Sequence, residues 1–191
     1  MSEANTLLDF WFGAPGSAER DRPRDIWFKT DPVFDKTLRQ RFLGDYERAA
    51  AGTCRAWLDE PDSALALVLL LDQLPRNLFR GSPRAFASDP LAREAARHAI
   101  GRGFDRGMAP IRRWFVYLPF QHSELLADQE LSVALTETLP DDGDKAEALD
   151  YARRHHIVIA RFGRFPHRNR VLGRANTAEE AAFLQEKRSG F

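Results

Sequence analysis

One segment of this 191-residue chain is apolar on every side, and it limits the folds that the rest of the sequence can adopt. From Pro61 to Leu74 the sequence reads PDSALALVLLLDQL, and apolar side chains occupy every face of a helix built from it. A helix that is hydrophobic all round must be covered by other elements. Its apolar run, Ala64 to Leu71, is far shorter than the roughly 20 residues that span a bilayer. We therefore expect a central, buried helix and no membrane span.

Helix-start signals precede and follow this central segment. Asp31-Pro32 and Asp89-Pro90 each place an N-cap residue before a proline at the first helical position. Apolar side chains then recur at helical spacing, and glycines at 52, 101 and 103 end the two elements. The two predicted stripes are Phe34, Leu38, Phe42, Tyr46 and Ala49, and then Leu91, Ala95, Ala96, Ala99 and Ile100.

The remaining segments also read as helices. We expect helices over residues 111–118, halted by Pro119, and over residues 123–139 and 144–162. Thr177 and Glu180 have the spacing of a capping box before a last helix. No segment alternates with period two for long enough to predict a strand. The sequence thus predicts an all-α fold without a sheet, in which helical hairpins stack in chain order within one domain, residues 1–191.

Composition excludes several classes of function. The formal net charge is zero, so no global field would draw the chain to nucleic acid or to anionic lipid. The lone Cys54 excludes an internal disulfide framework, and we expect it to be a small core residue. The first residues lack the basic and apolar regions of a signal peptide, which predicts a cytoplasmic protein. We expect no cofactor and no metal site, and the sequence pattern does not specify an oligomeric state.

Three polar segments stand out from the helical background. The first is LDQLPRNLFRG at residues 71–81, directly after the central helix. The second is LPFQHSE at 118–124, and the third runs from His155 to Arg174. A functional site, if the chain carries one, should draw on these segments.

These segments resemble a bacterial family known as domain of unknown function 924, which is placed in the tetratricopeptide-like helical superfamily. The resemblance covers nearly the whole chain. It rests on LDFWFG at 8–13, LDQ at 71–73, PRN at 75–77, HSE at 122–124, RFGRFPHRN at 161–169 and LGR at 172–174. Leu125 departs from the acidic residue that we expect after the HSE triplet. The resemblance implies a right-handed stack of antiparallel helical hairpins, and it implies no activity.

Charge is strongly separated in the third segment. Seven arginines and no carboxylate lie between Tyr151 and Arg174, whereas the preceding residues 137–150 are rich in Asp and Glu. Gly163 fits a helix end and Pro166 the start of a following helical turn. Backbone amides there, beside Arg164 and Arg168, would suit a phosphate or carboxylate. The alternative is structural, because arginines near helix ends also pair with carboxylates such as Asp72 and Glu124.

Two proline-initiated motifs look alike. Pro-Arg-Asn at 75–77 and Pro-His-Arg-Asn at 166–169 each place a guanidinium and an amide just past a proline. Asn77 and Asn169 can hold a turn by bonding nearby backbone. The alternative hypothesis is that Arg76 and Arg168 converge on one pocket, with Asp72 orienting one of them.

The histidines allow both a structural and a catalytic interpretation. Ser123 reads as an N-cap, with Glu124 in the first helical turn. His155 shares a helical face with Tyr151 and Phe162, which is typical of a core histidine. If instead it pairs with Glu124, it becomes a candidate general base. Candidate catalytic residues are thus His155, Glu124 and His122, while adjacent His155 and His156 point about 100° apart and cannot chelate one metal.

Three hypotheses follow for function. The first is a helical scaffold whose polar, arginine-rich pocket binds a small anion or the acidic end of a peptide. The second is a hydrolase that uses the same pocket, with His155 or Glu124 as base and arginines stabilising negative charge. The third is a tetratricopeptide-like interaction module whose motif residues only hold the fold. The predicted pocket comprises Asp72, Arg76, Asn77, His122, Glu124, His155, Arg161, Arg164, Arg168 and Asn169.

Overall fold

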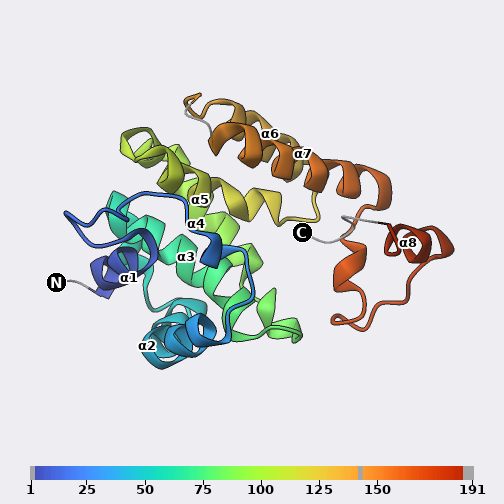
Figure 1. Ribbon diagram of the computed structural model, residues 1–191, viewed down its shortest axis with the longest axis horizontal. Coiled ribbons are helices and arrows are strands. Elements are labelled where there is room, and N and C mark those ends of the chain that lie inside the picture. The colour runs from blue at the N-terminus through green and yellow to red at the C-terminus, as the bar shows by residue number, and fades with distance from the viewer. Residues whose placement is uncertain (1–2, 142–143, 187–191) are drawn as a thin grey trace. The chain divides into compact units, whose positions relative to one another are not determined.

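The computed structural model describes residues 3–141 and 144–186, and all regular elements in these ranges are helices (Figure 1). This confirms the predicted all-α class. The α-helices are α1 Glu3–Phe12, α2 Pro32–Ala50, α3 Pro61–Leu78, α4 Asp89–Gly101, α5 Pro110–Gln121, α6 Leu126–Glu137, α7 Asp144–Phe162 and α8 Ala178–Phe183. Short 3₁₀ helices are η1 Asp25–Trp27, η2 Arg55–Asp59, η3 Pro83–Ala85, η4 Phe104–Gly107 and η5 Pro166–Arg168.

The described residues form two compact units. The N-terminal unit extends to Pro119, apart from Gly81–Pro83, which belong with the C-terminal unit that begins at Phe120. Each unit is described separately below. The single domain over residues 1–191 and the right-handed hairpin stack stay predictions.

Helix α3 is the centre of the N-terminal unit, as its sequence predicts. Its residues from Ala64 to Pro75 are all buried, and α1, α2 and α4 pack around it. Asp31 caps α2 by accepting hydrogen bonds from the backbone N–H groups of Val33 and Phe34, which confirms that start signal. The five apolar side chains of the predicted α2 stripe are all buried.

Two predicted boundaries in this unit are wrong. Helix α3 continues through Pro75 to Leu78, past the predicted end at Leu74. Pro75 has no N–H to donate to the carbonyl of Leu71, and the hydroxyl of Ser88 donates to that oxygen instead, at 2.7 Å. Helix α4 takes Ser88 as its N-cap position, and Asp89, the predicted cap, directs its carboxylate to Arg76.

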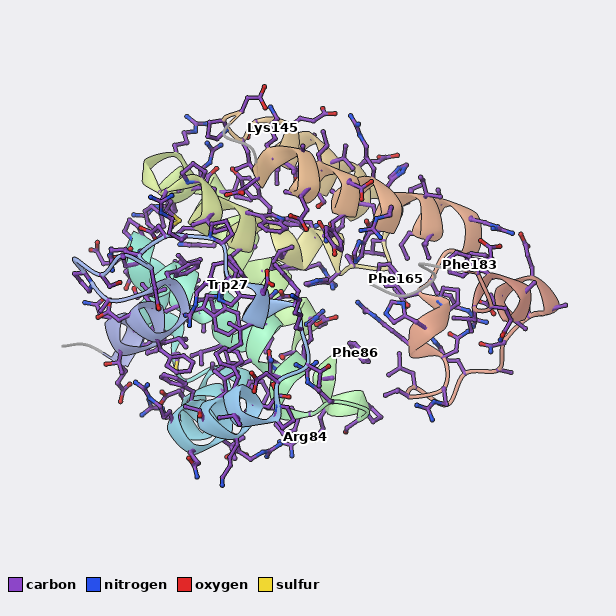
Figure 2. The ribbon with its side chains drawn as sticks, in the orientation of Figure 1. Trp27, Arg84, Phe86, Lys145, Phe165 and Phe183 are labelled. Atoms are coloured by element: carbon purple, nitrogen blue, oxygen red, sulfur yellow. The ribbon has the colours of Figure 1, made fainter. Side chains whose placement is uncertain are left out.

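An aromatic cluster completes the N-terminal unit. Trp27, labelled in Figure 2, stacks on Trp11 and meets the edges of Phe12 and Phe115. These four side chains are buried. Phe28 differs, because 53% of it is exposed.

The C-terminal unit contains the α6–α7 pair, which lies side by side (Figure 1), followed by η5 and α8. The predicted bounds of α7 and the capping box of Thr177 and Glu180 are confirmed. Asp144, which begins α7, follows a predicted turn whose last two residues lie outside the described ranges.

The link between α5 and α6 departs from its prediction. Pro119 lies inside α5, which ends at Gln121, and α6 begins at Leu126. Ser123 is therefore not an N-cap; its hydroxyl donates to Asp128 at 2.7 Å. The Gln129 side chain donates to three carbonyl oxygens of the connecting segment, those of Phe120, Gln121 and Ser123. A single buried amide thus fixes a turn that local sequence signals do not reveal.

Among the described helices, none is long and apolar enough to cross a membrane.

Candidate functional site

The ten predicted pocket residues fall into both units. Asp72, Arg76 and Asn77 lie in the N-terminal unit, and the other seven lie in the C-terminal unit. One pocket shared by all ten stays a prediction. The contacts of each group are described within its own unit.

Arg76 lies between two carboxylates in the last turn of α3. Its Nη1 and Nη2 donate to the two carboxylate oxygens of Asp89, at 3.0 and 3.2 Å. Asp72, one turn earlier on the same helix, completes the arrangement with an Arg76–Asp72 separation of 3.4 Å. Burial lowers the pKa of Arg76, but the two negative charges outweigh it and raise the pKa. This guanidinium joins α3 to the start of α4.

Asn77 also links two helices. Its amide donates at 2.8 Å to Asp35 on α2, which also accepts a hydrogen bond from Arg80. The prediction that Asn77 bonds nearby backbone is wrong, because its partner is a side chain 42 residues earlier. The predicted similarity to Pro-His-Arg-Asn at 166–169 also fails, since residues 75–77 lie inside the α-helix α3 and residues 166–168 form the short 3₁₀ helix η5.

In the C-terminal unit, two of the predicted arginines bind adjacent glutamates of α8. Arg161 donates to Glu179 at 2.9 Å on the surface. Arg164 forms a two-pronged pair with Glu180, at 2.6 and 2.7 Å, and donates to the carbonyl of Ala175. The Arg164 hydrogen bond, with the Thr177 backbone bond, lowers the pKa of Glu180 to about 2 against its desolvation by burial. Arg161 thus links α8 to the last turn of α7, and Arg164 links α8 to the segment that follows α7.

Glu124 binds an arginine, Arg174, as the structural alternative anticipates, and the pairing with His155 in the catalytic alternative is wrong. Arg174 donates to both carboxylate oxygens, at 2.8 and 2.9 Å, and the backbone N–H of Phe165 donates to one of them at 2.7 Å. Burial raises the pKa of Glu124, but the Arg174 and Phe165 hydrogen bonds together lower it below its usual value. A carboxylate with a lowered pKa is a weak base, so this geometry does not favour Glu124 as a general base.

His155 is a buried histidine in the middle of α7. Its Nδ1 lies 2.8 Å from the carbonyl oxygen of Tyr151, which favours a proton on Nδ1 in the neutral ring. Burial lowers the pKa of His155 well below 6.5, and the positive charges of His122, Arg168 and His167 lower it further. The core-histidine interpretation is confirmed, and its surroundings are electropositive.

Several of these cationic groups meet around one ring. Phe165, labelled in Figure 2, is fully buried. Its ring centroid lies 5.6 Å from that of His155 and 5.4 Å from that of His167, and the guanidinium of Arg168 lies 4.5 Å from it. Arg168 also donates to the carbonyl of His122 at 3.0 Å, and the rings of His122 and His155 are 6.1 Å apart. We call His122, His155, Phe165, His167 and Arg168 the Phe165 cluster.

Sequence reasoning does not identify two residues of this region. His167 lies beside Arg168 on η5 and was not counted as a site residue; its place within the 161–169 motif was the available signal. Arg174 was noted only as a motif end, yet it neutralises Glu124. Asn169 bonds Asn176 at 2.8 Å and holds the loop between η5 and α8.

Comparison with known proteins gives a family and a structural relative. The family described as "Bacterial protein of unknown function (DUF924)" matches residues 7–188. A solved structure of a protein of unknown function from Agrobacterium tumefaciens is 41% identical, with a TM-score of 0.85, and the match covers 96% of this chain and 97% of that chain. No curated protein matches this sequence. The tetratricopeptide-like placement stays a prediction.

Proposed function

The chain belongs to the bacterial DUF924 family, and we propose that it binds a small anion, such as phosphate or a carboxylate, at the Phe165 cluster. The observation that carries the proposal is that His155, His167 and Arg168 surround the buried ring of Phe165. His122 joins this group through its ring contact with His155 and its carbonyl, which accepts a hydrogen bond from Arg168. Of the predicted pocket residues, the proposal keeps His122, His155 and Arg168. We also place this binding in the cytoplasm, where a buried free thiol such as Cys54 stays reduced.

The electrostatics of the cluster support an anionic ligand. The charges of His122, Arg168 and His167 all disfavour a proton on His155. An anion seated among these groups would reverse that effect, because an opposite charge within about 4–6 Å favours the charged form. Binding and protonation of the cluster would therefore strengthen each other.

The exposed side chains of the cluster leave a route from solvent by which an anion could enter. His167 is exposed, His122 is half-buried, and His155 and Arg168 are buried. The histidine rings and the guanidinium supply N–H donors, and the Phe165 ring excludes water beside them. Hydrogen bonds between charged groups are the stronger class, and a low local dielectric strengthens them further.

Isothermal titration with inorganic phosphate tests this function. We expect wild-type protein to bind phosphate and Arg168→Gln to bind at least about tenfold more weakly, since a hydrogen bond to a charged group contributes roughly 1.5–3 kcal/mol. Arg170→Gln is the matched control, because Arg170 is an exposed arginine two residues away. It should bind as the wild type does.

Because Arg168 is buried, a second variant protects the test against misfolding. His122→Asn alters a half-buried member and should also weaken phosphate binding. Phosphate at 100 times its dissociation constant should stabilise wild-type protein by about 2.7 kcal/mol in a melting experiment. Absence of phosphate, sulfate and acetate binding to the wild type would reject the proposal, as would full affinity in both cluster variants.

A further inference from the structure

The backbone of Phe165, labelled in Figure 2, is held by one ion pair. Phe165 lies between α7 and η5 with an extended backbone. Its N–H donates to Glu124 at 2.7 Å, and its carbonyl oxygen accepts from Arg174 at 3.1 Å. Glu124 and Arg174 also bind each other through two hydrogen bonds, at 2.8 and 2.9 Å. This pair therefore fixes the residue whose ring lies at the centre of the Phe165 cluster.

Glu124 also places a negative charge beside the cluster. Two residues earlier, the carbonyl of His122 accepts a hydrogen bond from Arg168. Burial raises the pKa of Glu124, and the hydrogen bonds from Arg174 and Phe165 lower it. The positive charge of Arg168 lowers the pKa further, so Glu124 and Arg168 lie close enough to interact. A carboxylate in this position would repel an anion seated beside Arg168.

Arg174 cancels that negative charge. Its planar guanidinium meets both carboxylate oxygens of Glu124 in the two-pronged geometry of a strong ion pair. The two side chains are partly buried, with 29% of Glu124 and 23% of Arg174 exposed, so salt screens their charges less than it screens a surface pair. With Arg174 present, the cluster lies beside a neutral pair. Without it, an uncompensated carboxylate would remain within reach of Arg168.

We propose that the Glu124–Arg174 pair determines whether the Phe165 cluster accepts an anion, with Arg174 neutralising the one carboxylate that would oppose it. This inference rests on the anion binding proposed above. Both are positioning residues, because Arg174 acts through Glu124, and Glu124 acts through Phe165 and Arg168. A charge effect and a purely structural effect differ in sign for one variant. Removing the charge of Glu124 alone leaves the cluster more positive, which should strengthen anion binding.

Calorimetric titration of four full-length proteins with inorganic phosphate tests the inference: wild type, Arg174→Gln, Glu124→Gln and the double variant. Arg174→Gln should bind at least about tenfold more weakly, because it leaves a like charge beside the anion. Glu124→Gln should bind about threefold or more tightly, since Arg174 is then uncompensated and the new amide oxygen can still accept from the N–H of Phe165. The double variant restores a neutral pair and should bind within about threefold of the wild type.

Two further variants make these results interpretable. Arg170→Gln is the matched control, because it removes an exposed arginine from the same segment, and it should bind as the wild type does. Arg174→Lys keeps the positive charge and should bind within about threefold of the wild type, which covers the case in which Arg174→Gln does not fold.

The outcomes separate this inference from the proposed function. If wild-type protein binds phosphate and both single variants and the double variant bind it more weakly, the pair only holds the backbone, and the inference is overturned while the proposed function stands. Full affinity in Arg174→Gln would overturn it in the same way. Absence of phosphate binding to the wild type would reject the proposed function, and this inference with it.

Discussion

The side chain of Glu180 makes two different structural interactions. Its side chain closes the capping box on the backbone N–H of Thr177 and also binds the guanidinium of Arg164. Glu179, the preceding residue, makes one contact with Arg161 on the surface. Two adjacent glutamates of one helix therefore differ in the number of interactions that their side chains make.

The pKa of about 2 for Glu180 predicts a defined acid dependence of stability. Since this value lies below the ordinary value of 4.5, the folded state favours the carboxylate, and the stabilisation is complete above about pH 5. It declines as the pH falls toward 2. Urea unfolding from pH 7 to pH 2.5 should show Glu180→Gln less stable than wild type at neutral pH, with the difference shrinking on acidification.

Glu179→Gln is the matched control for this prediction, because its side chain is 62% exposed. Exposed ion pairs contribute little to stability. Its unfolding should follow that of the wild type at every pH. A Glu180→Gln protein whose deficit is the same at pH 7 and at pH 2.5 would show that the carboxylate charge does not contribute.

At the scale of elements, the sequence predicted helix positions better than helix ends. Helices α2 and α7 begin where their local signals lie, because Asp31 caps α2 and the acidic first turn of α7 suits its dipole. The ends at Pro75 and Pro119 were wrong, since both helices continue past their prolines. Pro75 is tolerated inside α3 because the Leu71 carbonyl that it leaves unbonded finds another donor, and no pattern in the neighbouring sequence reveals that donor.

Ser88 is that donor for Pro75, which predicts a measurable coupling between the two residues. Ser88→Ala should cost about 1–3 kcal/mol, because the buried carbonyl of Leu71 would lose its hydrogen bond. In a Pro75→Ala background the same substitution should cost less, because the N–H of the new alanine can bond to Leu71. Chemical unfolding of both single variants and the double variant measures this coupling. If Ser88→Ala lowers the free energy of unfolding equally in the two backgrounds, the Ser88 hydroxyl does not compensate for the N–H that Pro75 lacks.

At the scale of the whole molecule, the polar motifs proved mainly to be connections. Arg76, Arg161 and Arg164 each bind a carboxylate in their own unit, as the structural alternative in the sequence analysis anticipated. The sequence indicated an arginine partner for Glu124 but not which arginine, because Arg174 lies 50 positions away. The Phe165 cluster was predicted only in part. The motifs indicate the polar residues His122, His155 and Arg168, but not that His155, His167 and Arg168 pack against the ring of Phe165.

The anion proposal makes binding depend on pH. His155 gives up its proton readily in the unliganded protein, and burial is the largest cause. A bound anion raises the pKa of His155. Complex formation therefore takes up protons at pH values between the pKa of His155 in the free protein and its pKa in the complex. Affinity should therefore rise as the pH falls through this window.

Nuclear magnetic resonance of the histidine rings tests the anion site most directly. Ring proton shifts of His122, His155 and His167 are followed against pH, without phosphate and with saturating phosphate. We predict that phosphate raises the pKa of His155 by about one unit or more, as an opposite charge at close range does. The ring resonances of His98, in the N-terminal unit, should not respond to phosphate. Identical titration curves for His155 with and without phosphate would contradict the account.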